Sequence, residues 1–144
     1  LAITPTDRRI QGDARRLIWS DNTADALLLV TEEPVNLLSS SARGAVIAFD
    51  IRLESEPPHP VTLAIECGKS CAGRVWLADD LATLPTREWQ RVHVTLECFE
   101  SAGADLSRVS SVFSISADGP TELSLADIRI EAQGAPGAVL GCDG

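Results

Sequence analysis

Apolar and polar residues alternate with a period of two in several segments, and this pattern predicts β-strands. Between residues 45 and 53, Ile47, Phe49 and Ile51 share one face of the expected strand, whereas Asp50 and Arg52 fall on the other. The same alternation marks strands at residues 61–66, 89–96 and 113–115. Weaker patterns at 15–19, 26–30 and 74–77 add three candidates. With one more near the C-terminus, we expect about eight short strands.

The last clear strand, residues 121–131, changes phase along its length. Leu123 and Leu125 belong to one phase of the alternation, and Ile128 belongs to the other. A strand that changes phase contains a bulge or a bend, which we place near Ala126–Asp127.

A helical pattern occurs only once in the sequence. Leu77, Leu81 and Leu84 follow the i, i+4, i+7 spacing of one helical face before Pro85 stops the segment. Helix content should therefore be low. Short strands separated by turns of Gly, Pro, Ser and Asp predict an all-β fold, namely an antiparallel β-sandwich of the jelly-roll type.

The length of 144 residues fits one domain. Within it we expect an N-terminal connector over residues 1–14, a β-sandwich module over 15–131 and an irregular C-terminal tail over 132–144. With 44% hydrophobic and 23% charged residues, the composition is that of a folded globular protein. Every apolar run is far shorter than the roughly 20 residues that cross a bilayer, so no membrane partner is expected.

The charge excludes one class of partner. Twelve basic against 21 acidic residues give a net charge of −9, which repels nucleic acid. The first sixteen residues differ from the rest, because four arginines and two aspartates give them +2. Two interpretations of this segment stay open: a solvated N-terminal strand, or a connector that docks on an acidic neighbouring domain.

Catalytic and metal-binding patterns find no support in the sequence. Only His59 and His93 could serve as a base for a nucleophile, and His93 falls on the polar face of its expected strand. No phosphate loop and no zinc-protease motif is present. No cofactor is therefore expected, although calcium at carboxylates such as Asp50, Asp127 and Glu131 stays open because oxygen ligands are available.

The four cysteines suggest one disulfide and leave a second open. Cys67 and Cys71 enclose a three-residue turn, and in an exported chain we expect them to be joined, which is worth about 2 kcal/mol. Cys98 has the inward parity of its expected strand and could be a buried free thiol. Cys142 reaches Cys98 only if the tail folds back.

Three tryptophans are the candidates for a sugar-stacking surface. A polar turn follows Trp19 directly, so we expect Trp19 to be exposed and, with Asp21 and Asn22, to be the substrate-binding candidate. Trp76 and Trp89 lie beside inward-facing strand positions and are expected to be buried. A tryptophan in a sandwich is also often a core residue, and that alternative stays open.

A set of short motifs resembles one known family. The motifs are Gln11–Arg16 with Trp19-Ser20, Cys67-Gly68, Cys71-Ala72-Gly73, Trp89, Leu96–Phe99, Gly103–Leu106 and Leu123–Ile128. Together they are similar to the C-terminal domain of bacterial family 3 glycoside hydrolases of the ExoP type, the exo-acting β-glucan glucohydrolases. The likeness covers roughly residues 8–131.

The resemblance implies a galactose-binding-like β-sandwich that follows the catalytic domains of a secreted or periplasmic bacterial β-glucosidase. The catalytic nucleophile and acid of such enzymes lie in the earlier domains, so this chain is expected to be non-catalytic. Its implied partners are those catalytic domains and β-glucan oligosaccharides. Two roles compete: an accessory module that packs on the catalytic unit and borders its cleft, or an independent module that holds β-glucan. Exposed tryptophans converging on a groove favour the second role, and a broad apolar patch near Arg8–Arg16 favours the first.

Overall fold

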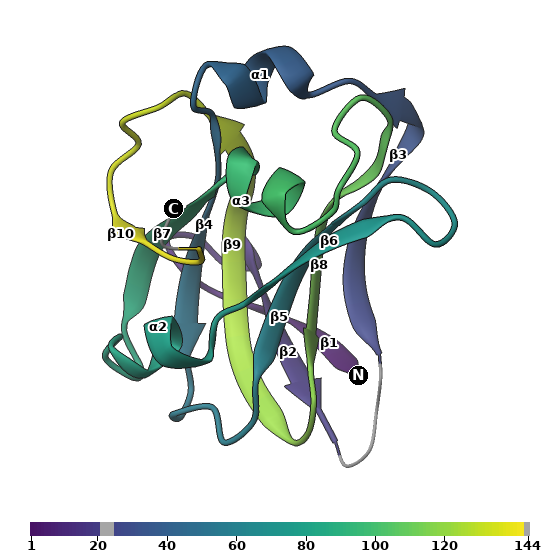
Figure 1. Cartoon of the computed structure of the whole chain (residues 1–144). Coiled ribbons are helices and arrows are strands. Elements are labelled where there is room, and N and C mark those ends of the chain that lie inside the picture. Colours follow the sequence, from purple (N-terminus) through teal and green to yellow (C-terminus); the bar gives the residue numbers. More distant parts are fainter. Residues whose placement is uncertain (21–24, 143–144) are drawn as a thin grey trace.

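The computed structural model describes residues 1–20 and 25–142, which form a two-layer β-sandwich (Figure 1). The larger sheet has the strand order β1-β2-β9-β4-β7-β10, with bounds Ala2–Thr6 (β1), Ala14–Trp19 (β2), Thr121–Glu131 (β9), Val46–Leu53 (β4), Trp89–Thr95 (β7) and Ala138–Val139 (β10). The smaller sheet has the order β3-β8-β5-β6, with bounds Ala26–Val35 (β3), Val109–Ala117 (β8), Val61–Glu66 (β5) and Ala72–Trp76 (β6). The short helices are Leu38–Ala42 (α1), Ala78–Ala82 (α2) and Leu96–Ser101 (α3). The predicted all-β sandwich with little helix is confirmed.

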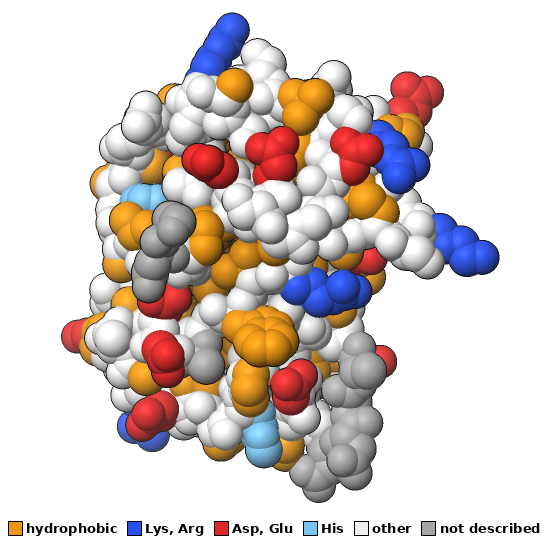
Figure 2. Space-filling view, in the orientation of Figure 1, with side chains coloured by type: hydrophobic (Ala, Val, Ile, Leu, Met, Phe, Trp, Pro, Cys, Tyr) orange, Lys and Arg blue, Asp and Glu red, His pale blue; other side chains and the backbone are white. Residues whose placement is uncertain are grey.

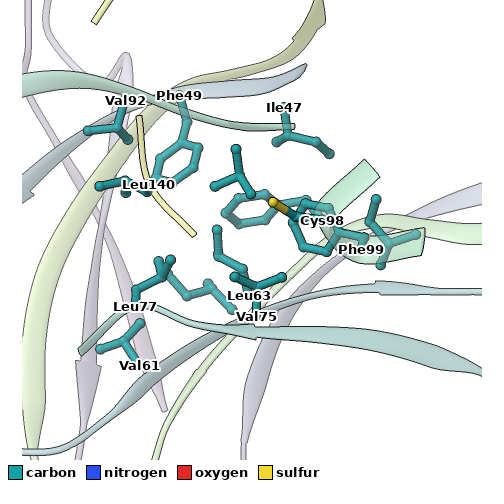
Figure 3. Close-up of a cluster of buried hydrophobic side chains, with 14 of the residues drawn as sticks. Ile47, Phe49, Val61, Leu63, Val75, Leu77, Val92, Cys98, Phe99 and Leu140 are labelled. Atoms are coloured by element: carbon teal, nitrogen blue, oxygen red, sulfur yellow. The ribbon is translucent and has the colours of Figure 1, made fainter. Parts of the chain in front are cut away.

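The core lies between the two sheets and contains most of the alternating apolar side chains that the sequence pattern selected (Figure 3). It also takes in Cys98 and Phe99 from α3 and Leu140 from the tail, which the alternation did not select. Phe49 from β4 and Phe113 from β8 meet edge to face, with ring centroids 5.4 Å apart. This arrangement directs the positive edge of one ring at the negative face of the other, and it joins the two layers at their centre.

The predicted bulge in the last strand is present. Ala48 of β4 faces Arg129 and Asp50 faces Ala126, so two residues of β9 oppose the single residue between them. Asp127 has a φ of 55°, a left-handed conformation that occurs at bulges and that Asp tolerates better than most side chains. The phase change in the sequence therefore corresponds to a β-bulge in the backbone of β9. The predicted helical turn is also present, as α2.

The segment after β7 differs from its prediction. The strand pattern was expected to continue to Leu96 and to place Cys98 inward, but the chain turns into helix α3. Thr95 still has extended backbone angles, and the helix that follows buries Leu96, Cys98 and Phe99. Leu96 and Cys98 would share one face of a strand, and Leu96 and Phe99 share one face of a helix, so the pattern did not separate the two.

The sheets extend beyond the expected limits of the module. Residues 2–6, expected to belong to a connector, form β1 and pair along their whole length with β2. The tail, expected to be irregular, contributes β10, which pairs in parallel with Val92 and His93 of β7. Both ends of the chain are therefore incorporated in the larger sheet. None of the helices in the described part of the chain is long and apolar enough to cross a bilayer.

Candidate functional site

Trp19 is a core residue, which corrects the prediction that it is exposed. Its side chain is 2% exposed, and its indole Nε1 donates a hydrogen bond to the backbone oxygen of Asp25 at 2.9 Å. On β2, Trp19 shares the inward face with Leu17, two residues earlier. A buried indole offers no face to a sugar ring, so Trp19 is not a stacking platform. Asp21 and Asn22, its expected partners, lie outside the described residues.

The prediction for Trp76 is also wrong, in the opposite direction. It was predicted to be buried, but it is 75% exposed at the end of edge strand β6. Gly73 and Val75 of β6 point into the molecule, so Arg74 and Trp76 point outward from the same strand. This parity was available in the sequence, because Val75 and Leu77 are the apolar pair that must face the core.

A groove of about 490 Å³ runs beside Trp76, between β6, α3 and the C-terminal tail. Figure 2 shows this hollowed face, with apolar side chains gathered in it. We call it the Trp76 groove. It is lined by Arg74, Val75, Trp76, Cys98, Ser101, Ala102, Gly141 and Cys142.

The walls of the Trp76 groove are held by covalent and close contacts. Cys98 of α3 and Cys142 of the tail form a disulfide, which settles the pairing that the sequence left open. Gly141 N–H donates to a carboxylate oxygen of Asp80 in α2 at 3.0 Å. On the other wall, a Cβ at Gly73 would overlap the carbonyl oxygen of Phe99, so α3 rests directly on β6. These contacts fix the shape of the groove.

The predicted disulfide between Cys67 and Cys71 is present at the turn between β5 and β6. Ser70 in this turn has a φ of 59°, and Gly68 has a φ of 105°. A glycine carries no Cβ, so it adopts such angles at little cost and allows the tight closure. The turn lies at the opposite end of β6 from Trp76 and so fixes the other end of this edge strand.

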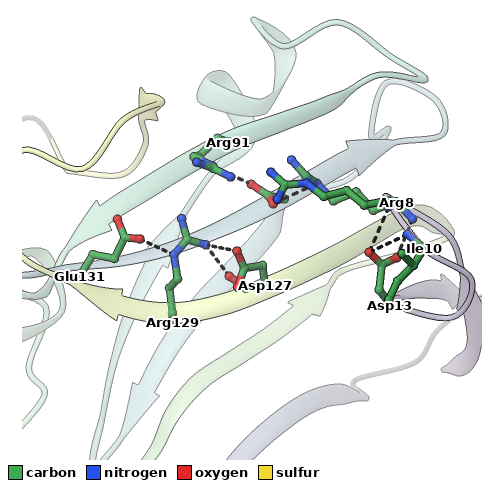
Figure 4. A network of polar contacts seen from close by, with 9 residues as sticks. Arg8, Ile10, Asp13, Arg91, Asp127, Arg129 and Glu131 are labelled. Atoms are coloured by element: carbon green, nitrogen blue, oxygen red, sulfur yellow. Dashed lines mark hydrogen bonds and ion pairs between the residues drawn. The ribbon is translucent and has the colours of Figure 1, made fainter.

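The outer face of the larger sheet carries a dense set of ion pairs (Figure 4). Asp50 is fully buried there between two arginines: its Oδ2 is 3.0 Å from Arg8 Nε, and its Oδ1 accepts a hydrogen bond from Arg91 Nε at 3.3 Å. The Arg8 contact is a close charge pair without a directed hydrogen bond. The Arg8 guanidinium also lies 5.9 Å from the ring centre of Trp89, within reach of a cation–π contact.

The segment from residue 7 to 13 holds Arg8 in this position. Asp13 accepts hydrogen bonds from the backbone N–H groups of Arg8, Arg9 and Ile10, at 2.7, 3.0 and 3.3 Å. These bonds, with Arg8 N–H first, hold the pKa of Asp13 below its usual value, because they stabilise the charged carboxylate. The loop thus folds back over the sheet and covers Asp50 and Trp89. Trp89, predicted to be buried in the core, lies partly buried under Arg8 on the outer face.

The calcium alternative finds no support in the arrangement of its three carboxylates. Asp50 faces Arg8 and Arg91, whereas Asp127 and Glu131 both face Arg129. Arg129 Nε donates a hydrogen bond to the Glu131 carboxylate, and this bond raises the pKa of the Arg129 guanidinium above its usual value. Each carboxylate is thus matched by an arginine, and residues 1–20 and 25–142 contain no cluster of three metal-binding side chains.

The two histidines do not form a catalytic arrangement. His93 was expected on an exposed strand face, but it is 8% exposed because the tail runs beside β7, where Leu140 N–H donates to the His93 oxygen at 2.8 Å. His59 is exposed. No hydrogen bond joins either imidazole to a hydroxyl or carboxylate of a described residue. The structure therefore shows no activated nucleophile in the described chain.

A second groove, of about 480 Å³, lies at the other open edge of the sandwich. Its apolar lining comes from Ile3 of β1, Leu27 and Leu29 of β3, and Leu125 and Ile128 of β9, and we call it the β1/β3 edge. The strands that border it also expose large apolar side chains: Ile3, Ile18, Leu28, Leu29, Val30 and Val35. The sequence did not reveal this patch, because alternation alone does not show which edge strands stay uncovered.

Comparison with known structures finds the same fold in carbohydrate-active proteins. The extra C-terminal domain of the exo-1,3/1,4-β-glucanase ExoP from a Pseudoalteromonas species is 18% identical, with a TM-score of 0.78 over 99% of this chain and 76% of that one. The ExoP enzyme itself matches with 18% identity and a TM-score of 0.74, over 94% of this chain but 16% of the enzyme. The family 30 carbohydrate-binding module of the Clostridium thermocellum cellulase Cel9D-Cel44B is 16% identical, with a TM-score of 0.71 over 92% of this chain and 83% of that module.

These neighbours show the fold and nothing further, because their sequence identities to this chain are low. A search of curated protein sequences finds no match. The family model of Exop_C, described as galactose-binding domain-like, matches residues 1–130, which is most of the chain. This match agrees with the resemblance seen in the motifs. The chain therefore belongs to the Exop_C family of galactose-binding domain-like modules.

Proposed function

We propose that the chain is a non-catalytic accessory module of a secreted or periplasmic bacterial glycoside hydrolase of family 3, and that it packs on the catalytic unit of a β-glucan-degrading enzyme. The observation that carries this proposal is the apolar β1/β3 edge. Exposed apolar patches of this kind mark interaction surfaces, since leaving them in water is unfavourable.

The position of the β1/β3 edge supports the catalytic unit as its occupant. The N-terminal strand β1 borders the edge, and Gly12, Asp13 and Arg15 line the groove beside it. In ExoP the same fold is one part of a longer glucanase. A domain that precedes this module in such an enzyme would join it beside the apolar groove, where docking buries the exposed side chains.

Three of the four arginines in the first sixteen residues are already engaged within the chain. Arg8 is committed to Asp50, and Arg16 pairs with Glu122. Arg15 donates to the backbone oxygens of Gly12 and Ala14. Apolar burial is therefore a better basis for docking than charge at this edge. The two disulfides also support export, because such bonds persist in oxidising compartments.

The test uses the polypeptide encoded directly before Leu1. If a family 3 catalytic unit is encoded there, it is produced without this module, and the 144-residue chain is added in trans. We expect complex formation by size-exclusion chromatography and an increase in the melting temperature of the catalytic unit. Leu29→Asp at the β1/β3 edge should weaken the complex at least about tenfold, because a charge would be buried in an apolar interface.

The matched control is Val139→Asp, which adds the same charge at an exposed apolar position on β10, far across the sheet order from β1. It should leave the complex intact. The competing role, an independent module that holds β-glucan, would be favoured if the chain did not associate with the catalytic unit but bound glucan alone at low micromolar concentration.

A further inference from the structure

We infer that the Trp76 groove is a saccharide subsite that takes one neutral hexose unit of a β-glucan chain. This inference rests on the proposed function for the identity of the sugar. The exposure of Trp76, the chemistry of Arg74 and Ser101 and the rigidity of the walls indicate the site itself.

Trp76 is the first observation. It is 75% exposed, whereas Trp19 is 2% exposed and Trp89 lies partly buried beneath Arg8. An exposed indole loses the favourable burial that the other two obtain, so a ligand or partner that covers it is expected to gain that free energy. The flat, electron-rich face of an indole suits the apolar C–H face of a pyranose ring.

Arg74 is the second observation. It lies two residues before Trp76 on the same outward face of β6, at a strand separation of about 7 Å. It makes no ion pair with any residue in the described ranges. A guanidinium carries five N–H donors and no acceptor, so it can bind the hydroxyl oxygens of a sugar that stacks on Trp76. Ser101 on the facing wall adds a hydroxyl that donates and accepts.

Rigidity is the third observation. The disulfide between Cys98 and Cys142 fixes the tail wall, and the tail is held again by the hydrogen bond from Gly141 to Asp80. The opposite wall, α3, rests on β6 at Gly73. Since little conformational freedom is left to lose on binding, a shallow groove of about 490 Å³ can hold a small ligand.

The position of the groove agrees with this role. The β1/β3 edge and the Trp76 groove lie at opposite open edges of the sandwich, because β1 and β3 begin the two strand orders and β10 and β6 end them. In Figure 1, β3 and the C-terminal tail lie on opposite sides of the molecule. A module that docks through the first edge leaves the second free to contact glycan.

The test is an NMR titration of the whole 144-residue chain labelled with nitrogen-15. Its three tryptophans give three indole N–H signals. The probes are β-1,4- and β-1,3-linked glucotetraose, with α-1,4-linked maltotetraose for comparison. We expect the Trp76 signal to shift with a β-linked probe, at a dissociation constant of about high-micromolar to millimolar, while the Trp19 signal stays unchanged.

Substitutions in the Trp76 groove show which side chains bind the sugar. Trp76→Ala should weaken binding about tenfold or more, Trp76→Phe should retain part of it, and Arg74→Ala should weaken it a few-fold. Ile10→Ala is the matched control, because Ile10 is 71% exposed and lies outside both grooves. It should bind as the parent chain does.

Several results would overturn the inference. One is the absence of any shift with up to about 20 mM of either β-linked probe, well above the expected dissociation constant. Another is a shift confined to residues outside the groove. A third is loss of binding to the catalytic unit in Trp76→Ala, which would make the groove a protein interface. The docking test contains no sugar, so the failure of one proposal is distinguishable from the failure of the other.

Discussion

Among the described residues, Asp50 is the most deeply buried charged side chain, although it lies on the outward face of its strand. Its carboxylate is enclosed by Arg8 from the N-terminal loop and Arg91 from β7. Both arginines keep part of their side chains exposed, at 16% and 32%. The ion pairs thus anchor the loop of residues 7–13 on the sheet, and this anchoring depends on a single carboxylate.

We predict that Asp50→Asn lowers the free energy of unfolding by about 3 kcal/mol, because two arginines would then face each other over a neutral amide in a poorly hydrated site. Urea denaturation followed by fluorescence measures this value. Asp127→Asn is the matched control, since Asp127 is 57% exposed in its ion pair and Asn also accepts its left-handed backbone. A loss below about 0.5 kcal/mol is expected there, and an equal loss in both variants would contradict the prediction.

Asp13 predicts how the same loop responds to acid. Its pKa in the folded chain lies below the usual 3.8, chiefly through the N–H of Arg8. The loop is therefore fully stabilised above about pH 3.8 and loses this contribution as the pH falls through the folded-state pKa. An NMR titration of the Asp13 carboxyl should show this depressed value, and below it the amides of Arg8 and Ile10 should lose protection, measured against their intrinsic exchange rates at each pH. A midpoint for Asp13 at or above 3.8 would show that the loop bonds do not form in solution.

At the scale of elements, β6 and α3 pack so closely that no side chain fits between them at Gly73. Gly73 has no Cβ, and this lets the strand approach Phe99 of α3 and Ala104, which follows the helix. The helix in turn carries Cys98, one end of the tail disulfide. One small residue on an edge strand therefore sets the position of a helix, a disulfide and one wall of the Trp76 groove.

We predict that Gly73→Ala destabilises the chain by about 2 kcal/mol or more, because its methyl group would overlap backbone that cannot move independently of the disulfide. Thermal unfolding measures the loss. Arg74→Ala, at the next position on the same strand, provides the control, since its side chain is exposed. If Gly73→Ala were as stable as Arg74→Ala, the helix would have to be more loosely packed than the structure shows.

At the scale of the whole molecule, the two disulfides act over very different lengths of chain. Cys67–Cys71 spans a sequence separation of 4 and fixes a turn, whereas Cys98–Cys142 spans 44 and attaches the tail to the body of the sandwich. The long loop encloses β8, β9 and β10. Since loop-closure entropy grows with the logarithm of loop length, the long bridge restricts the unfolded chain more strongly.

We predict that the double variant Cys98→Ser/Cys142→Ser loses about 4 kcal/mol of unfolding free energy and that Cys67→Ser/Cys71→Ser loses about 2 kcal/mol. Urea denaturation of both variants without reductant gives the comparison. The reverse order of stability would mean that local strain, and not chain entropy, decides the contribution of each bridge.

The sequence by itself determined the local features of this protein. The period of two in residues 45–53 and 121–131 located strands and a bulge, because side chains of an extended backbone alternate wherever the strand lies. The spacing of Leu77, Leu81 and Leu84 located α2, and the three-residue turn between Cys67 and Cys71 was short enough to indicate its own disulfide. The family resemblance, carried by short motifs, agrees with the family match over residues 1–130.

Only the tertiary structure decided which of these residues are available for function. The polar turn after Trp19 predicted exposure but does not state what covers the indole, and Trp19 is buried. Trp76 was placed inside although its strand parity points outward, and it is exposed. Asp50 and His93 lie on a polar face, yet the N-terminal loop covers one and the tail runs beside the other. Burial depends on contacts between segments far apart in the chain, and a local pattern holds no information about such contacts.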